Sequence, residues 1–431
     1  MDTNKKTWPY LLGVAGYTIT DTFLQTWLTF FFVPPPDKGI SLVKPEVYGN
    51  AFLLARIVEA LCNPLIGFGA ERTGKPWLFM GLGGFVFASV GMSLFFLAQP
   101  GQSDWNSVIL FGMLPIMTLG QACFIVPYLG LIPKIAPTPN QQVALTNNQT
   151  LWILTGVLIG QVLSGKAIEF LSGSLQTAAL CFLNVAMVLM ILASLSVRSV
   201  ETRSEQRFSL QEMGAILERN RGFQLLVAAL FLFWLGFSMV RNAVTYFVTV
   251  LLNQPKETVG VYFGILSVTT LISVGTTRVL APRLGLRRMM LISSLLFAVI
   301  LPLLATIGFK VGPFAPTTWA QIVFALLGLP LGILSSLQNS IVAEQAEQDA
   351  LKTGTSKTAL FFGVQGLLIK MSYGLAASLL GFLQSTFGYT SAHPLGIQLI
   401  GPIAGFLALC AAALYYFYPK NLSGQKTTAL T

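Results

Sequence analysis

Charge is scarce in this chain of 431 residues: 10% of the residues are charged, whereas 54% are hydrophobic. The mean hydropathy is +0.71. An average soluble domain carries about 25% charged residues. The composition therefore excludes an ordinary water-soluble globular protein and predicts an integral membrane protein.

Histidine and cysteine are also scarce, which argues against several kinds of chemistry. His393 is the one histidine and falls in a short predicted loop. The four cysteines all fall within apolar runs, so we expect buried thiols rather than disulfides or a metal site. A histidine-based triad and an intramembrane histidine relay are excluded. Since no metal or nucleophile cluster is found either, we predict that the chain is not an enzyme and needs no cofactor.

The alternating segments of about ten residues that mark an outer-membrane barrel are missing as well. The spans are therefore expected to be helices, which satisfy the hydrogen bonds of the backbone N–H and C=O groups in lipid. Because a hydrocarbon core of about 30 Å needs about 20 apolar residues per helix, long apolar runs predict spans. Twelve runs qualify, at residues 9–33, 46–70, 77–99, 106–133, 144–170, 175–197, 223–252, 257–281, 288–308, 318–343, 357–386 and 394–418.

The distribution of basic residues predicts an orientation. The chain lacks a cleavable signal peptide pattern, since residues 1–7 are polar and the first apolar run has no small-residue cleavage pattern. With a cytoplasmic N-terminus, the outer segments carry only Lys38, Lys44, Lys166, Lys256 and Lys310. This asymmetry follows the positive-inside rule and places both termini in the cytoplasm. The net charge of +10 is then explained by basic residues in the cytoplasmic segments next to the lipid bilayer, which is the expected partner. We expect no nucleic-acid partner.

Four ionisable side chains nevertheless lie deep inside apolar runs: Asp21, Arg56, Glu59 and Lys370. Each would cost about 2.5–3.5 kcal/mol at the bilayer centre on insertion scales if it were left unpaired. Spacings of three and four residues put Arg56, Glu59 and Asn63 on one helical stripe. Two acids balance two bases, which predicts a polar cavity where an ion or solute can exchange with a protein charge.

The chain divides near its middle into two similar parts. The long polar stretch at 198–222 joins six predicted spans to six, and basic turns at 71–76 and 283–288 hold corresponding places in the two parts. We predict an N-terminal six-helix half at 1–198, a cytoplasmic linker at 199–222 and a C-terminal half with a short tail at 223–431. Parallel halves of this kind are typical of the major facilitator architecture.

Four stretches carry a resemblance to a known family. Residues 16–21 place an acid on the first helix, and residues 55–67 contain Arg56, Glu59 and an Asn-Pro pair. Residues 126–133 have two prolines around an aromatic and a leucine, and residues 365–375 contain Lys370. In this order, the stretches resemble the glycoside-pentoside-hexuronide:cation symporters, the melibiose-permease-like family of the major facilitator superfamily. The resemblance implies an all-α membrane protein with twelve transmembrane helices in two pseudo-symmetric halves.

The resemblance also implies a cation-coupling site. Glu59 matches an acid that holds the coupling ion in the family, with Arg56 beside it and Lys370 on the eleventh helix nearby. Asn63 stands where a second acid is usual. Because a hard cation such as Na⁺ needs enough oxygen charge to offset its dehydration, this loss favours H⁺ over Na⁺ as the coupling ion. The alternative is a static network of Arg56, Glu59 and Lys370 that only locks the helices.

The implied sugar site departs further from the family. Asp21 matches an acid that accepts hydrogen bonds from sugar hydroxyls, but Ile125 and Leu129 replace a second acid and an aromatic platform. Hydrogen bonding and an aromatic face remain possible from Gln25, Tyr128, Asn148, Gln149, Trp152 and Gln365. Aromatic residues at helical spacing are also common in ordinary packing, so both roles stay open for them.

Arg241 lies near the centre of the seventh predicted span. Two interpretations are open: a cavity cation that attracts an anionic solute or pairs with Asp21, or a guanidinium bonded to carbonyls of a broken helix. Arg278, closer to the inner boundary, is expected to snorkel.

Together these patterns predict a secondary transporter that works by alternating access. We predict symport of a sugar, glycoside or similar small polar solute with a cation, in the inner membrane of a bacterium, by a monomer. The alternative within the same fold is a facilitator or exporter of a lipid-like or anionic solute. A pore or scaffold is a further alternative, and saturable counterflow would distinguish it.

Overall fold

The computed structural model of the chain describes all residues except 1–2, 137, 172–173, 201–209, 355–356 and 420–431. Over the described ranges the secondary structure is helical, and the β-structure found there is one isolated bridge between Val311 and Phe314. The chain forms two compact units. The first comprises Met1–Phe208, Val244–Thr249 and Gln254–Val261, and the second comprises Ser209–Ala243, Val250–Asn253 and Tyr262–Thr431.

Twelve helical segments of the described chain are long enough to cross a bilayer. Eleven of them are also apolar enough by composition. The twelfth, α1 (Thr3–Phe32), has 30 residues, but Asp21 and several threonines make it more polar. Thr18, Thr22 and Thr26 each donate to the carbonyl four residues earlier at 2.7 Å, so their hydroxyls are satisfied within the helix. The predicted all-α membrane fold is thereby confirmed.

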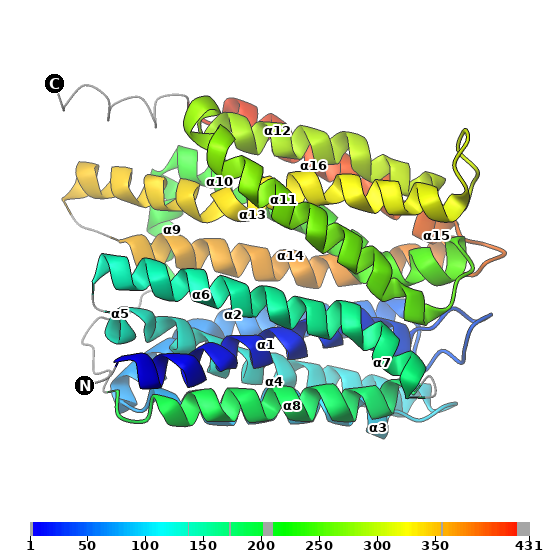
Figure 1. Ribbon diagram of the computed structural model, residues 1–431, viewed down its shortest axis with the longest axis horizontal. Coiled ribbons are helices and arrows are strands. Elements are labelled where there is room, and N and C mark those ends of the chain that lie inside the picture. The colour runs from blue at the N-terminus through cyan, green and yellow to red at the C-terminus, as the bar shows by residue number, and fades with distance from the viewer. Residues whose placement is uncertain (1–2, 137, 172–173, 201–209, 355–356, 420–431) are drawn as a thin grey trace. The chain divides into compact units, whose positions relative to one another are not determined.

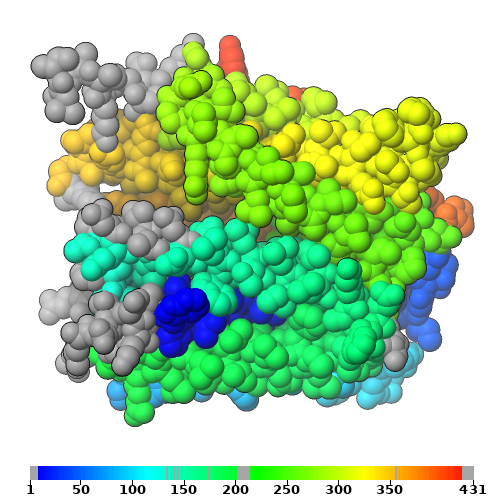
Figure 2. All heavy atoms as spheres, in the orientation of Figure 1, coloured from blue at the N-terminus to red at the C-terminus, as the bar shows by residue number. Residues whose placement is uncertain are grey.

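The first unit surrounds α1. Its other elements are α2 (Pro45–Thr73), α3 (Pro76–Leu97), α4 (Ser103–Gly130), α5 (Ile132–Ile135), α6 (Pro139–Val157), the π-helix η1 (Leu158–Leu163), α7 (Ser164–Phe170), α8 (Leu175–Ser196) and η3 (Lys256–Thr258). Helix α1 packs against α6 and α8 (Figure 1), and Figure 2 shows it as a narrow blue strip between them. A Cβ on Gly16 would lie 2.5 Å from the Ala186 carbonyl oxygen, so only glycine permits this approach of α1 to α8.

A tight turn joins α2 to α3. Pro76 begins α3, where a missing N–H costs nothing, and Gly74 caps α2 with a φ of 65° in the left-handed region. The Gly74 N–H donates to the Glu71 carbonyl, which closes the helix end. This turn corresponds to the basic turn predicted at 71–76.

The second unit contains α9 (Leu210–Arg219), α10 (Arg221–Tyr246), the π-helix η2 (Phe247–Leu251), α11 (Val259–Leu284), α12 (Leu286–Ile300), η4 (Leu301–Thr306), α13 (Pro316–Thr353), α14 (Thr358–Phe387), α15 (Leu395–Gln398) and α16 (Ile400–Phe417). The end of α10, most of η2 and the start of α11 belong to the first unit. Helix α12 packs against α13 and α16 (Figure 1).

Helix α13 is long, with 38 residues, and its far end is held by the connecting helix α9. There Arg219 Nη2 donates to both carboxylate oxygens of Asp349, at 2.8 and 2.9 Å. Residues 201–209 of the predicted linker lie outside the described residues. The predicted boundaries at 198–199 and 222–223 stay a prediction.

Candidate functional site

The centre of the candidate site is an ion pair within α2. Arg56 Nη1 lies 2.7 Å from Glu59 Oε2, and the two side chains are 3% and 0% exposed. Side chains three residues apart lie on the same face of a helix, which is why Arg56 and Glu59 can pair within α2. The Arg56 guanidinium also lies 4.9 Å from the centre of the Phe52 ring, one turn earlier. Both charges are thus paired away from lipid, as their cost in the membrane requires.

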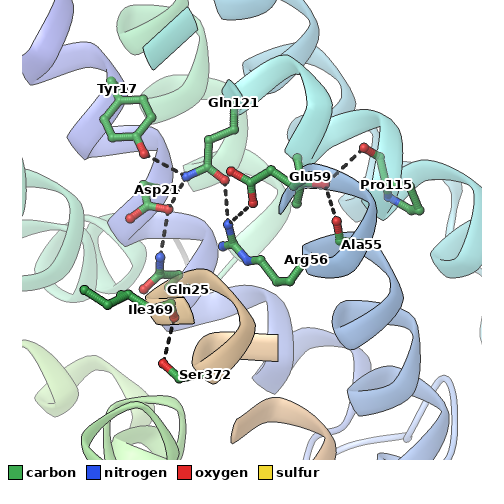
Figure 3. Close-up of polar contacts among 11 residues, drawn as sticks. Tyr17, Asp21, Gln25, Ala55, Arg56, Glu59, Pro115, Gln121, Ile369 and Ser372 are labelled. Carbon is green, nitrogen blue, oxygen red and sulfur yellow. Dashed lines mark hydrogen bonds and ion pairs between the residues drawn. The ribbon is translucent and has the colours of Figure 1, made fainter. Parts of the chain in front are cut away.

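Gln121 on α4 joins this ion pair to the acid on α1 (Figure 3). Its Oε1 accepts from Arg56 Nη1 at 2.9 Å, and its Nε2 donates to Asp21 Oδ1 at 2.8 Å. The same Nε2 also donates to the Tyr17 hydroxyl at 3.0 Å. Glu59, Arg56, Gln121 and Asp21 therefore form one continuous network across three helices.

Gln121 is not among the residues predicted from the sequence to form the site. A signal was present, because a buried amide in the middle of an apolar span needs hydrogen-bond partners as an ion does. The partners could not be found from spacing, since Arg56 and Gln121 lie 65 residues apart in the sequence. The helices are held in register by Thr118, whose hydroxyl donates to the Ala55 carbonyl at 3.0 Å.

Asp21 and Gln25 lie one turn apart on α1. Gln25 Nε2 donates to Asp21 Oδ1 at 2.7 Å, so that one carboxylate oxygen accepts from both amides. Among the described residues, Gln25 Oε1 is buried without a donor. Asp21, Gln25, Arg56 and Gln121 line a small pocket with room for about one water molecule. Its other walls are apolar and include Phe52 and Phe87.

Asn63 follows Glu59 by one turn of α2 and is half-buried. Its Oδ1 has no hydrogen-bond partner among the described residues. In the same ranges there is no group of three or more His, Cys, Asp or Glu side chains that could hold a metal ion. Asn63 thus supplies a neutral oxygen close to the Arg56–Glu59 pair.

Tyr128 and Gln149 form a second cluster in the first unit. Gln149 Nε2 donates to the Tyr128 hydroxyl at 3.3 Å, and the Tyr128 ring stacks on Tyr10 at 4.2 Å. Trp152 meets Trp8 edge to face at 5.7 Å, and Asn148 is exposed. None of these four candidates forms a hydrogen bond with Asp21 among the described residues.

A ladder of rings connects the two clusters. Tyr128 stacks on Phe124 with centroids 5.6 Å apart, and Phe124 stacks on Tyr17 at 6.1 Å. Tyr17 in turn accepts from Gln121. The aromatic residues near Tyr128 are therefore packed in series, and the ladder ends at the polar network.

The remaining candidates belong to the second unit. Gln365 on α14 is buried and donates from Nε2 to Asn339 Oδ1 at 3.2 Å. Lys370, five residues further, is half-buried on the same helix. Arg241 on α10 places its guanidinium 5.2 Å from the centre of the Tyr373 ring. The predicted proximity of Lys370 to Glu59 stays a prediction.

Comparison with known proteins identifies the family. The family model for MFS/sugar transport proteins matches residues 9–421. The isoprimeverose transporter of Lactiplantibacillus pentosus is 23% identical over 436 residues, which cover 95% of this chain and 88% of that protein. The uncharacterized symporter YnaJ of Bacillus subtilis (strain 168) is 22% identical, with 97% of this chain and 91% of that protein covered.

Among solved structures, the crystal structure of the nucleoside transporter NupG has a TM-score of 0.69. Its sequence identity is 14%, and the match covers 96% of this chain and 98% of that one. A point mutant of NupG matches with a TM-score of 0.70. At 14% identity, this similarity shows the fold alone. The relatives and the structural neighbours are transporters, not enzymes. The chain is an integral membrane transporter that belongs to the family of MFS/sugar transport proteins, as the four motifs predicted.

Proposed function

We propose that the chain is a cation-coupled symporter of a sugar, glycoside or similar small polar solute, driven by H⁺ rather than Na⁺. It would act as a monomer in the inner membrane of a bacterium, with both termini in the cytoplasm. Transport would proceed by alternating access, in which ion and solute together favour one conformation through their differential affinity for it.

The observation that supports this proposal best is the bridge made by Gln121. Its oxygen accepts from Arg56 and its nitrogen donates to Asp21. Protonation of Glu59 would remove the counter-ion of Arg56, and the amide then connects that change to the carboxylate that faces the pocket. If the state of Glu59 changes the affinity of Asp21 for solute, solute binding must change the proton affinity of Glu59 to the same extent.

Asp21 and Gln25 supply hydrogen-bond acceptors for the hydroxyl groups of a solute. Both hydrogen bonds to Asp21 reach Oδ1, which leaves Oδ2 as an acceptor, and Gln25 Oε1 is a second acceptor. Tyr128, Asn148, Gln149 and Trp152 stay candidates for solute contact, as does Gln365.

The charge balance supports H⁺ as the ion. Glu59 is fully buried and already paired with Arg56 at 2.7 Å, so little negative charge remains for a metal ion. A proton on Glu59 needs no further ligands, whereas Na⁺ would need several oxygens. Asn63 contributes a neutral oxygen to this place, and we propose Lys370 as the cation that responds to the state of Glu59.

The test is transport in proteoliposomes with Glu59→Gln. Suitable probes are isoprimeverose, the solute named for one relative, and a panel of monosaccharides and disaccharides. We expect the wild type to accumulate solute in response to a proton gradient. One pH unit is worth about 1.4 kcal/mol, so a 1:1 symporter would accumulate solute about tenfold. Glu59→Gln should abolish accumulation while counterflow exchange continues.

Glu46→Gln is the matched control, because Glu46 lies on the same helix but is exposed in its first turn. It should accumulate solute as the wild type does. Accumulation by Glu59→Gln with unchanged dependence on pH would contradict the assignment of the coupling group. Accumulation driven by a sodium gradient alone would identify Na⁺, and exchange with neither gradient would identify a facilitator.

A further inference from the structure

Three helices of the second unit bring an arginine, two aromatic rings and an amide together. Arg241 and Trp234 lie seven residues apart on α10, hence on one face of the helix. The Tyr373 ring of α14 lies between them, 5.2 Å from the Arg241 guanidinium carbon and 6.0 Å from the Trp234 ring. All three side chains are half-buried.

Arg241 lacks the partners that an intramembrane arginine normally has. Arg56 and Arg219 form ion pairs with Glu59 and Asp349, but Arg241 forms none with any described acid. Its Nε is buried, and no described group accepts from it. No described carbonyl holds the guanidinium either, as a purely structural role in a broken helix would require. A buried donor left unsatisfied on a charged group is costly, and such a cost is common where a ligand completes the site.

The aromatic residues hold the guanidinium in a suitable orientation. Trp234 meets Tyr373 at an interplanar angle of 77°, and its Nε1–H donates to Gln338 Oε1 of α13 at 2.9 Å. The Tyr373 face attracts the cation but accepts none of its hydrogen bonds. Because the N–H groups of a guanidinium point outward in its own plane, they stay available for a planar anion with two oxygens.

We propose that Arg241 is the anchor of an anion-binding subsite built by α10, α13 and α14, which takes a carboxylate or a similar oxyanion on a small polar molecule. Tyr373 and Trp234 position Arg241 and provide a wall for the body of the ligand, and Gln338 fixes Trp234. This inference rests on the proposed transport function and narrows the solute to a class with a negative charge. The same chemistry could come from the headgroup of an anionic lipid.

Binding to the purified full-length chain tests the subsite without relying on transport. D-glucuronate and D-glucose form a matched pair of probes, measured by calorimetry in detergent. The lipid source is tested in nanodiscs of phosphatidylglycerol against nanodiscs of phosphatidylcholine, by competition with glucuronate. A hydrogen bond to a charged group is worth about 1.5–3 kcal/mol, so Arg241→Gln should weaken binding of the anion about 10- to 100-fold.

Two further variants make the test specific. Arg278→Gln removes the same charge from α11, where the side chain is exposed, and should leave binding unchanged. Arg241→Lys keeps the charge but loses the planar fork, so its affinity should fall between those of the wild type and Arg241→Gln. Thermal unfolding of each variant shows that it is folded.

The outcomes separate the subsite from the coupling mechanism. Arg241-dependent binding of glucuronate supports a soluble acid, and Arg241-dependent competition by phosphatidylglycerol supports a lipid headgroup. The subsite is refuted if neither anion binds, or if Arg241→Gln and Arg241→Lys both bind the anion as the wild type does. Proton-driven uptake of a neutral sugar without any effect of Arg241→Gln would refute the subsite alone. Anion binding without a Glu59-dependent gradient effect would refute the coupling proposal alone.

Discussion

Replacing Gln121 tests the network at the point where its two parts meet. Gln121→Met keeps the length and burial of the side chain but removes its hydrogen bonds to Arg56 and Asp21, at 2.9 and 2.8 Å. Asp21 is half-buried and lines the pocket, so water can replace part of its loss. Arg56 is 3% exposed, so water cannot replace the hydrogen bond that it loses. We therefore expect Gln121→Met to lower the free energy of unfolding by about 1.5–3 kcal/mol, mainly through the lost hydrogen bond to Arg56.

The assay is thermal unfolding in detergent, followed by proton-driven uptake in proteoliposomes. Gln161→Met is the control, because Gln161 is 6% exposed but has no charged hydrogen-bond partner among the described residues. Gln121→Met should lower Tm clearly more than Gln161→Met does, and it should weaken the dependence of solute affinity on pH. Equal shifts in Tm, or a solute affinity whose pH dependence is unchanged, would show that Gln121 does not transmit the state of Glu59.

Two further predictions concern packing and the connecting helix. Gly160→Ala places a Cβ 2.1 Å from Thr22 Oγ1, so it should destabilise the first unit by about 1–3 kcal/mol. Gly112→Ala is the control, because its Cβ meets nothing within 4 Å, and it should leave Tm unchanged in the same unfolding assay. A double-mutant cycle with Arg219→Gln and Asp349→Asn should give a coupling energy of about 1 kcal/mol, since Arg219 is 51% exposed although both oxygens of Asp349 are engaged. A coupling near zero would mean that this contact does not hold α9 to α13.

Local spacing determines the contacts of the candidate site that lie on one helix. Arg56 and Glu59 are three residues apart and form an ion pair, and Asp21 and Gln25 are four residues apart and share a hydrogen bond. A helix of known period fixes such pairs whatever else surrounds it. For the same reason the apolar runs predicted the spans, because hydrocarbon leaves the backbone no alternative to helix.

Contacts between helices could not be predicted in this way. Gln121 and Asp21 lie 100 residues apart in the sequence, and Gln149 and Tyr128 pair with each other rather than with Asp21. The resemblance that suggested Gln149 and Trp152 as solute contacts gives their places in the sequence, but it does not give the direction in which each side chain packs. The ring ladder from Tyr128 to Tyr17 was invisible for the same reason.

The sequence by itself determined that this transporter lies in a lipid bilayer, which segments are helical and to which family it belongs. Hydrophobicity, helical period and motif order are properties that can be read along the chain. Tertiary structure alone decided which polar groups share a pocket. Buried donors and acceptors in a membrane must find partners on other helices, and the rotation of each helix selects them. That selection joined Gln121 to the Arg56–Glu59 pair and left Arg241 on its aromatic support with no described acid beside it.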